Sequence, residues 1–165
     1  MHMLKEKGAK VSFDPNVRLE MLKEPEAMEV VKQVYREANI FMPGVSELKM
    51  ITGEENLENA IKKVFDDNKN MELLVLKNSS KGSEIYGPDG LLEKVGVYPV
   101  TQVDATGAGD SYDAAFICGL AEGKNVKEAA QMGAAAGALN AAAFGPMEGD
   151  ISRETVEEMI KLHEK

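Results

Sequence analysis

Val103-Asp104-Ala105-Thr106-Gly107-Ala108-Gly109-Asp110 is the stretch that decides how this chain is interpreted, because small residues run directly into an acid at the start of an expected helix. From Gly107 to Gly109 no side chain exceeds a methyl group, so successive backbone N–H groups can converge on an anion near the positive end of the helix dipole. Asp110 then lies in the first turn, where it can accept the proton of an attacking hydroxyl during phosphoryl transfer. The stretch predicts a phosphate cradle with its own base, and the alternative is a tight turn before an acidic helix start.

Two other phosphate-binding motifs do not match this stretch. A Walker loop requires Gly-Lys-Ser/Thr after its spacer, whereas Gly109 is followed here by Asp110 and Ser111. A dinucleotide fingerprint requires a third glycine, and Tyr112 stands at that position. No clear strand-loop-helix-strand unit with a ribose-binding acid follows. The glycines therefore do not indicate either of these nucleotide folds.

Hydrophobic patterning along the chain predicts an α/β fold. Short apolar runs are typical of buried parallel strands, and apolar residues at helical spacing are typical of amphipathic helices. A polar turn at Gly87-Pro88-Asp89-Gly90 separates two strand-like runs, as in a hairpin. The expected strands cover 10–13, 40–42, 73–76, 84–86 and 91–97, and the expected helices cover 25–38, 45–51, 55–67, 110–120, 126–143 and 153–163.

Length and composition indicate one well-packed domain over residues 1–165. The chain has 44% hydrophobic residues, and 28 acidic against 19 basic residues give a net charge of −9. No basic patch interleaved with aromatic residues is present, so nucleic acid is not an expected partner. An acidic chain that binds a phosphorylated substrate must use local amides, a metal ion or a few basic side chains.

The chain gives no sign of secretion, membrane insertion or a cysteine-based site. The N-terminal residues lack the apolar core of a signal peptide and no 18-residue apolar run exists, so we expect a cytoplasmic protein without a membrane partner. Cys118 is the only cysteine and is expected to be a small core residue of the helix after Asp110. His2 and His163 have no partners at metal-ligand spacing, so no role is assigned to them.

Asp104-Ala105-Thr106-Gly107-Ala108-Gly109-Asp110-Ser111-Tyr112, followed by Asp113-Ala114-Ala115-Phe116, resembles the C-terminal signature of the ribokinase-like (PfkB) sugar kinases. The resemblance implies a three-layer α/β/α sandwich, with a mostly parallel sheet and helices on both faces. In that family the Gly-Ala-Gly amides form the anion hole for the transferred phosphoryl group, and the aspartate deprotonates the sugar hydroxyl. It therefore implies an anion hole at Gly107, Ala108 and Gly109 and a catalytic base at Asp110, with ATP as the phosphoryl donor.

Val11-Ser12-Phe13-Asp14-Pro15-Asn16-Val17-Arg18 is similar to the Asp-Pro-Asn-x-Arg segment of fructokinase-like and 2-keto-3-deoxygluconate-kinase-like members. An apolar alternation that runs into Asp-Pro-Asn is typical of a strand that ends in a turn. The resemblance implies substrate contacts by Asn16 and Arg18, since a guanidinium group suits oxyanions. The alternative is an Asp-Pro turn with a solvated arginine. The sequence does not identify the sugar or sugar acid.

Two segments depart from the family pattern. Pro43-Gly44-Val45-Ser46-Glu47 has Gly44 where Asn-x-x-Glu is common, and the resemblance implies that Glu47 helps to organise Mg²⁺. Its alternative is an ordinary first-turn glutamate. In the segment 74–83, Ser79 stands where a glycine is usual. Lys77 and Asn78 are candidates to line the phosphate channel, and a strand end closed by a polar turn explains them as well.

The helix over 126–143 carries a run of alanine and glycine from Gly133 to Ala143, which requires a close neighbour. That neighbour is either another helix or a flat ligand ring. In the family this region borders the adenine pocket, so Asn140 and Gly145, together with Thr106, are nucleotide-side candidates, with packing as the alternative. A monovalent cation such as K⁺, bound by backbone carbonyls near Asp104 and Thr106, is also implied by the resemblance.

The resemblance covers only the C-terminal part of the family, so the fold is expected to be truncated on its N-terminal side. We expect a fragment of an ATP-dependent and Mg²⁺-dependent sugar or sugar-acid kinase that is inactive alone. A non-catalytic nucleotide-binding or interaction module is the alternative. A homo-oligomer is a third expectation, because a truncated sheet exposes apolar surface and an unpaired edge.

Overall fold

A computed structural model describes residues 5–18 and 25–163 of the chain. The chain divides into two compact units: unit 1 comprises Met1–Asn78 and Ile85–Leu92, and unit 2 comprises Ser79–Glu84 and Glu93–Lys165. The prediction of one nucleotide-binding domain over the whole chain stays a prediction. His2 lies outside the described residues.

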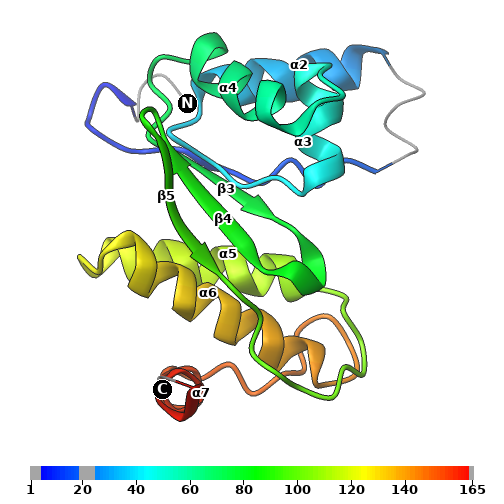
Figure 1. Ribbon diagram of the computed structural model, residues 1–165, viewed down its shortest axis with the longest axis vertical. Coiled ribbons are helices and arrows are strands. Elements are labelled where there is room, and N and C mark those ends of the chain that lie inside the picture. The colour runs from blue at the N-terminus through cyan, green and yellow to red at the C-terminus, as the bar shows by residue number, and fades with distance from the viewer. Residues whose placement is uncertain (1–4, 19–24, 164–165) are drawn as a thin grey trace. The chain divides into compact units, whose positions relative to one another are not determined.

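The described elements alternate between strands and helices and end in three successive helices (Figure 1). This order confirms the predicted α/β class. In chain order the elements are β1 (Ser12–Phe13), α2 (Pro25–Glu37), β2 (Ile40–Phe41), α3 (Val45–Thr52), α4 (Leu57–Asp67), β3 (Leu73–Lys77), the 3₁₀ turn η2 (Ser79–Lys81), β4 (Ser83–Gly87), β5 (Gly90–Val95), α5 (Ala108–Ala121), α6 (Val126–Ala141) and α7 (Arg153–His163).

The five strands form one sheet in the order β1-β2-β3-β4-β5. β1 pairs in parallel with β2, and β2 pairs in parallel with β3, with Ile40 opposite both Ser12 and Leu73. The three central residues of β3 are buried, as expected for a strand that is covered on both faces. The predicted hairpin is present as β4 and β5, which are joined by Pro88 and Asp89. Because parallel strands end at the same edge of a sheet, the residues after β1, β2 and β3 lie close together.

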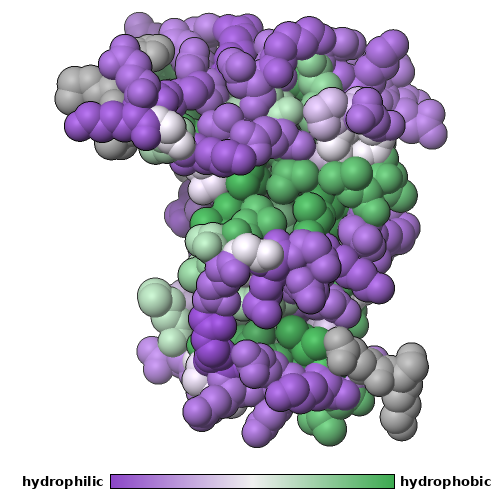
Figure 2. Space-filling model, turned by 90° about the vertical axis from the view of Figure 1, so that its left-hand side faces the viewer, coloured by the Kyte–Doolittle hydropathy of each residue, from purple (hydrophilic) through white to green (hydrophobic). Residues whose placement is uncertain are grey.

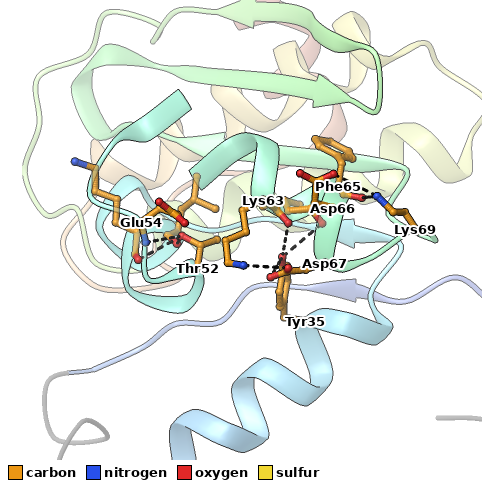
Figure 3. A network of polar contacts seen from close by, with 11 residues as sticks. Tyr35, Thr52, Glu54, Lys63, Phe65, Asp66, Asp67 and Lys69 are labelled. Atoms are coloured by element: carbon orange, nitrogen blue, oxygen red, sulfur yellow. Dashed lines mark hydrogen bonds and ion pairs between the residues drawn. The ribbon is translucent and has the colours of Figure 1, made fainter. Parts of the chain in front are cut away.

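The core of unit 1 forms between β1 to β3 and the amphipathic helices α2, α3 and α4. Tyr35 of α2 is buried at its centre, and its hydroxyl lies 3.4 Å from the carbonyl oxygens of Lys63 and Val64 and 3.5 Å from Asp67 Oδ2 (Figure 3). Burial, together with the Asp67 carboxylate, raises the pKa of Tyr35 above its ordinary range. The buried members of this core are Val31, Tyr35, Ala38, Phe41, Leu48, Ile51, Ala60, Val64, Met71, Leu74 and Leu76.

In unit 2, α5 and α6 pack so closely that a side chain at two glycines of α6 would require their neighbours on α5 to move. A Cβ atom at Gly133 would lie 3.0 Å from the Tyr112 carbonyl oxygen, and one at Gly137 would lie 3.0 Å from the Ala108 carbonyl oxygen. The small-residue run of α6 therefore packs against a helix, which is one of the two alternatives that the sequence left open. The Tyr112 hydroxyl lies 2.8 Å from Ser83 Oγ, and burial raises the Tyr112 pKa to about 12.

The surface agrees with an acidic chain, and the face drawn in Figure 2 is mostly hydrophilic. Cys118 is exposed, so the prediction that it is a core residue is wrong. The reason is helical geometry: Tyr112, Phe116 and Gly119 are the buried residues of α5, and Cys118 lies two positions after Phe116, on the other side of the helix. Within the described ranges, no helix combines the length and apolar character needed to cross a bilayer.

Candidate active site

The predicted cradle begins at Gly107, which is the N-cap residue of α5. Its φ of +79° lies in the left-handed region, where side chains are strained. A Cβ atom at this position would lie 2.0 Å from the carbonyl oxygen of Pro146, which is shorter than any real contact. Backbone therefore approaches backbone here, and only glycine fits. This geometry brings the N-terminus of α5 next to the loop that follows α6.

The three amides of the predicted anion hole are not equivalent. The N–H of Ala108 donates to the carbonyl of Ala105 at 3.2 Å, which closes a turn before the helix. The N–H groups of Gly107 and Gly109 have no hydrogen-bond partner within residues 5–18 and 25–163. Two of the three amides are therefore available to an anion, together with the positive end of the 14-residue helix α5.

Asp110 is the third residue of α5 and is exposed. Its carboxylate has neither a hydrogen bond nor an ion pair in the part of the chain that the structure describes. A carboxylate at this position is stabilised by the helix dipole and remains accessible to a substrate hydroxyl. The arrangement suits the role of a base, which stays a prediction.

Asp104 connects the two loops that flank the cradle, and no role of its side chain was predicted from the sequence. Its Oδ1 accepts the N–H of Thr106 at 2.9 Å, and its Oδ2 accepts the N–H of Gly145 at 3.2 Å. The hydrogen bonds from Thr106, with a further one from Gly145, hold the pKa of the Asp104 carboxyl below its ordinary value. Thr106 and Gly145, both predicted on the nucleotide side, are thus brought together by a third residue.

Asn140 of α6 is hydrogen-bonded to the loop that contains Thr106. Its side chain is fully buried, and Nδ2 donates to the carbonyl of Thr106 at 2.7 Å. Its Oδ1 has no hydrogen-bond partner among the described residues. The carbonyl of Ala141 accepts the N–H groups of Val103 and Asp104 at 2.8 and 3.2 Å. These contacts indicate that Asn140 supports the cradle loop, while its predicted contact with a nucleotide stays a prediction.

In unit 1, the residues predicted to bind substrate follow the ends of the parallel strands. Asp14 Oδ2 and Lys77 Nζ form an ion pair at 3.0 Å, which connects the end of β1 to the end of β3. Asn16 has a φ of +39°, and its N–H donates to Asp14 Oδ1 at 3.3 Å. Arg18 is exposed, while Asn78 is half-buried directly after β3. The structure therefore brings Lys77 to the Asp14–Arg18 segment.

Both carboxylate oxygens of Glu47 accept hydrogen bonds from backbone N–H groups. Oε1 accepts the N–H of Val17 at 2.7 Å, and Oε2 accepts the N–H of Gly44 at 2.7 Å. The second bond caps the start of α3 from the Glu47 side alone, since Gly44 has no side chain to complete a capping box. Among the residues described, no group of three or more His, Cys, Asp or Glu side chains is placed to hold a metal ion. The predicted magnesium role of Glu47 therefore fits poorly with these contacts.

Ser79 shows a physical reason for one departure from the family pattern. Its φ is +47°, a left-handed conformation that glycine adopts without strain and serine adopts at a cost of about 1 kcal/mol. A glycine at this position would remove that strain. Ser79 follows Lys77 and Asn78 directly and begins the 3₁₀ turn η2 after β3.

The candidate residues thus form two groups, one in each unit. Asp104, Thr106, Gly107, Asp110, Asn140 and Gly145 belong to unit 2, and Asp14, Asn16, Arg18, Glu47, Lys77 and Asn78 belong to unit 1. Hydrogen bonds link Asp104, Thr106, Asn140 and Gly145 in unit 2. In unit 1, an ion pair and a hydrogen bond link Asp14 to Lys77 and Asn16. The contacts of Asp104 and Glu47 were not foreseen from the sequence.

Curated relatives with similar sequences are sugar and sugar-acid kinases by name. The chain is 30% identical to 2-dehydro-3-deoxygluconokinase of Bacillus subtilis, in an alignment that covers 100% of this chain and 52% of that protein. It is 31% identical to Fructokinase-1 of Oryza sativa, over 99% of this chain and 52% of the relative. The chain therefore spans about half the length of the curated relatives it matches.

Solved structures show the same fold. A protein from E. coli described as a Ribokinase II, in complex with ATP and Mg²⁺, matches with a TM-score of 0.91 and 33% identity, over 98% of this chain and 52% of that one. A fructokinase variant from Vibrio cholerae with fructose, ADP and a potassium ion matches with a TM-score of 0.87 and 25% identity, over 96% of this chain and 53% of that one. These neighbours confirm the expected ribokinase-like fold, truncated relative to the full-length kinases.

A model of the pfkB family carbohydrate kinases matches residues 1–152 of the chain. The match includes both groups of candidate residues and the whole of α5 and α6. The chain therefore belongs to the pfkB family of carbohydrate kinases.

Proposed function

We propose that this chain carries the phosphoryl-transfer part of an ATP-dependent kinase that phosphorylates a hydroxyl group of a sugar or sugar acid. The observation that carries the proposal is the cradle at Gly107. A left-handed glycine, locked against the Pro146 carbonyl, is followed by a long helix with a free carboxylate in its first turn. Such a site combines an anion-binding helix N-terminus with a base at its rim.

The chemistry follows from these groups. The N–H groups of Gly107 and Gly109 stabilise negative charge on the phosphoryl group as it moves, and the α5 dipole adds to that stabilisation. Asp110 accepts the proton of the attacking hydroxyl. The Ala108 amide, which bonds to Ala105, holds the turn instead of the anion. Fixed backbone donors stabilise the transition state because they need little reorganisation during the reaction.

ATP is the proposed phosphoryl donor, and Mg²⁺ would accompany its phosphates, as is usual for hydrated magnesium. Glu47 is not proposed as a ligand of Mg²⁺, because both of its carboxylate oxygens already accept N–H groups. A monovalent cation near Thr106 would have to share the Thr106 carbonyl with Asn140 Nδ2. The first two named relatives act on a sugar acid and on fructose by their names, and an exposed arginine at Arg18 suits an anionic substrate.

Because the chain is expected to be inactive alone, the test measures ADP formation by a full-length relative in which this chain replaces the matching half, with Mg-ATP and either fructose or 2-dehydro-3-deoxygluconate. We expect Asp110→Asn to lower the sugar-dependent rate by roughly 10²- to 10⁴-fold, the usual contribution of a general base. Asp89→Asn, an exposed acid in the β4–β5 turn, serves as the matched control and should leave the rate unchanged. Equal rates for Asp110→Asn and the native chain would contradict the assignment.

Calorimetry with Mg-ATP separates this function from a non-catalytic nucleotide-binding module. Heat from ATP binding without any sugar-dependent ADP formation by the chain would favour the module. Binding of ATP that strengthens when either sugar is added would favour the kinase. A chain that binds neither ATP nor sugar would contradict both.

A further inference from the structure

We propose that Glu47 is a positioning residue, whose carboxylate holds the Asp14–Arg18 segment in the conformation that presents Asn16 and Arg18 to substrate. The link runs through the backbone N–H of Val17. The substrate part of this inference rests on the proposed function. The contact itself is independent of that function.

The carboxylate joins two segments that are 30 residues apart. Val17 N and Gly44 N each donate to one oxygen of Glu47 at 2.7 Å. Both bonds are short for an N–H donor, as expected when the acceptor carries a charge. A glutamate that only caps α3 would need the Gly44 bond alone. The bond to Val17 is therefore additional to the cap, and it fixes the residue next to Arg18.

The rest of the segment is held at its other end. The Asp14 side chain forms its ion pair with Lys77 and also accepts the N–H of Asn16. The Val17 side chain packs against the core of unit 1. Removal of the Glu47 carboxylate would leave Asp14 anchored and would free the backbone between Asn16 and Arg18. Glu47 thus controls the part of the segment that carries the candidate substrate groups.

Gly44 lies directly against the carboxylate. A Cβ atom at residue 44 would lie 3.3 Å from Glu47 Oε2, which is tighter than nine in ten real contacts. A larger residue would require the flexible end of Glu47 to shift by a few tenths of an ångström. The glycine that departs from the common family pattern therefore accompanies a glutamate folded back onto the backbone. This geometry favours positioning over direct ligation of a metal ion.

The first experiment follows amide exchange and amide chemical shifts in the ¹⁵N-labelled chain. We expect Val17 and Gly44 to be protected in the native chain, and Glu47→Ala to speed exchange at Val17 by about tenfold or more, as for a lost hydrogen bond to a charged group. Glu47→Gln keeps one acceptor oxygen, so it should retain one of the two bonds. Glu58→Gln changes an exposed first-turn acid of α4 and is the matched control.

Three results would overturn the proposal. The first is an unprotected Val17 amide in the native chain, and the second is a change at Gly44 alone in Glu47→Ala, since that would show simple helix capping. The third is loss of protection at both amides when Mg²⁺ is added without ATP, since that would show that the metal takes the carboxylate. Changes at residues 16–18 in Glu47→Ala, absent from Glu58→Gln, would support positioning.

The second experiment reads the consequence for substrate. Glu47→Ala, which loses the bond to Val17, should weaken binding of 2-dehydro-3-deoxygluconate by about 3- to 30-fold, equivalent to the loss of one such bond, and leave Mg-ATP affinity unchanged. Equal losses for both ligands would contradict a specific role in the substrate segment. If the native chain binds no sugar acid, the proposed substrate is wrong. Amide exchange at Val17 alone then decides whether Glu47 holds the segment.

Discussion

The cradle of unit 2 and the Asp14–Arg18 segment of unit 1 are held in place by different kinds of contact. The cradle depends on backbone: Gly107 fits against the Pro146 carbonyl, and the Thr106 carbonyl accepts the Asn140 amide. The segment depends on charged side chains, because Lys77 pairs with Asp14 and Glu47 accepts the Val17 N–H. A close backbone contact therefore dominates in one group of candidate residues, and charged side chains dominate in the other.

The difference predicts how each group responds to change. A Cβ atom at Gly107 would lie 2.0 Å from the Pro146 carbonyl oxygen, so no side chain fits there, whatever its charge. A partly exposed ion pair is sensitive to salt and to the loss of either partner, and its contribution to stability is smaller. Mutations should therefore cause larger losses in the cradle than in the segment.

Gly107→Ala gives the largest expected effect. Alanine at φ +79° is strained by about 1–2 kcal/mol, and the clash with the Pro146 carbonyl should raise the total loss of unfolding free energy to about 3–5 kcal/mol. Urea unfolding of the purified chain measures this loss. The result would show that the cradle excludes even a methyl group.

Gly123→Ala is the control, since Gly123 has nearly the same φ of +80° but nothing within 4 Å of a Cβ atom. It should lose only the backbone term of about 1–2 kcal/mol. Equal losses at both positions would show that the contact with Pro146 contributes nothing, and the comparison of the two regions would then fail on its first point.

Asn140→Ala should have the next largest effect. It removes the donor to the Thr106 carbonyl from a fully buried position, so we expect a loss of about 1–3 kcal/mol in unfolding free energy. Asn59→Ala changes an exposed helical asparagine and should alter stability by no more than about 0.5 kcal/mol. Faster amide exchange at residues 104–107 in Asn140→Ala alone would locate the effect in the cradle loop.

The sequence predicted the fold and the close backbone approach at Gly107 well, because both are encoded locally. The apolar run at residues 73–76 and the amphipathic pattern at residues 55–67 each identify an element without any knowledge of its partners. The glycines of the cradle also indicate that another group approaches the backbone closely there. The exposed position of Cys118 was missed, since α5 is apolar on most of its surface and its pattern does not single out one buried face.

The contacts of the substrate segment were not predictable in the same way. Val17 and Glu47 are 30 residues apart, and Asp14 and Lys77 are 63 apart, so no local pattern connects them. Only the parallel pairing of β1, β2 and β3 brings them to one edge of the sheet. Asp104 was missed for another reason: its hydrogen bonds reach Gly145 across a loop whose path the sequence does not specify.

The Asp14–Lys77 pair should give a smaller effect, measurable by a double-mutant cycle with Asp14→Asn and Lys77→Met. The Asp14 and Lys77 side chains are exposed by only 24% and 18%, and their Oδ2 and Nζ atoms lie 3.0 Å apart. We therefore expect a coupling energy of about 1 kcal/mol, which should fall as salt is added. The exposed Lys161–Glu157 pair at 3.8 Å provides the matched cycle and should couple by less than about 0.5 kcal/mol. Equal coupling in both cycles would remove the distinction between a site contact and an ordinary surface pair.

The smallest expected effect is the pH dependence of stability that arises from Asp104, whose charged side chain accepts hydrogen bonds from both loops of the cradle. Because folding lowers the pKa of Asp104, its carboxylate stabilises the folded chain above the pKa of the unfolded state. That contribution is lost as the pH falls below about 4 and through the lower folded-state pKa. Asp104→Asn should therefore be less stable than the native chain at neutral pH, and the gap should narrow toward pH 3. A gap that is constant with pH would show that the hydrogen bonds to Thr106 and Gly145 do not depend on charge, so that the cradle would rely on shape alone.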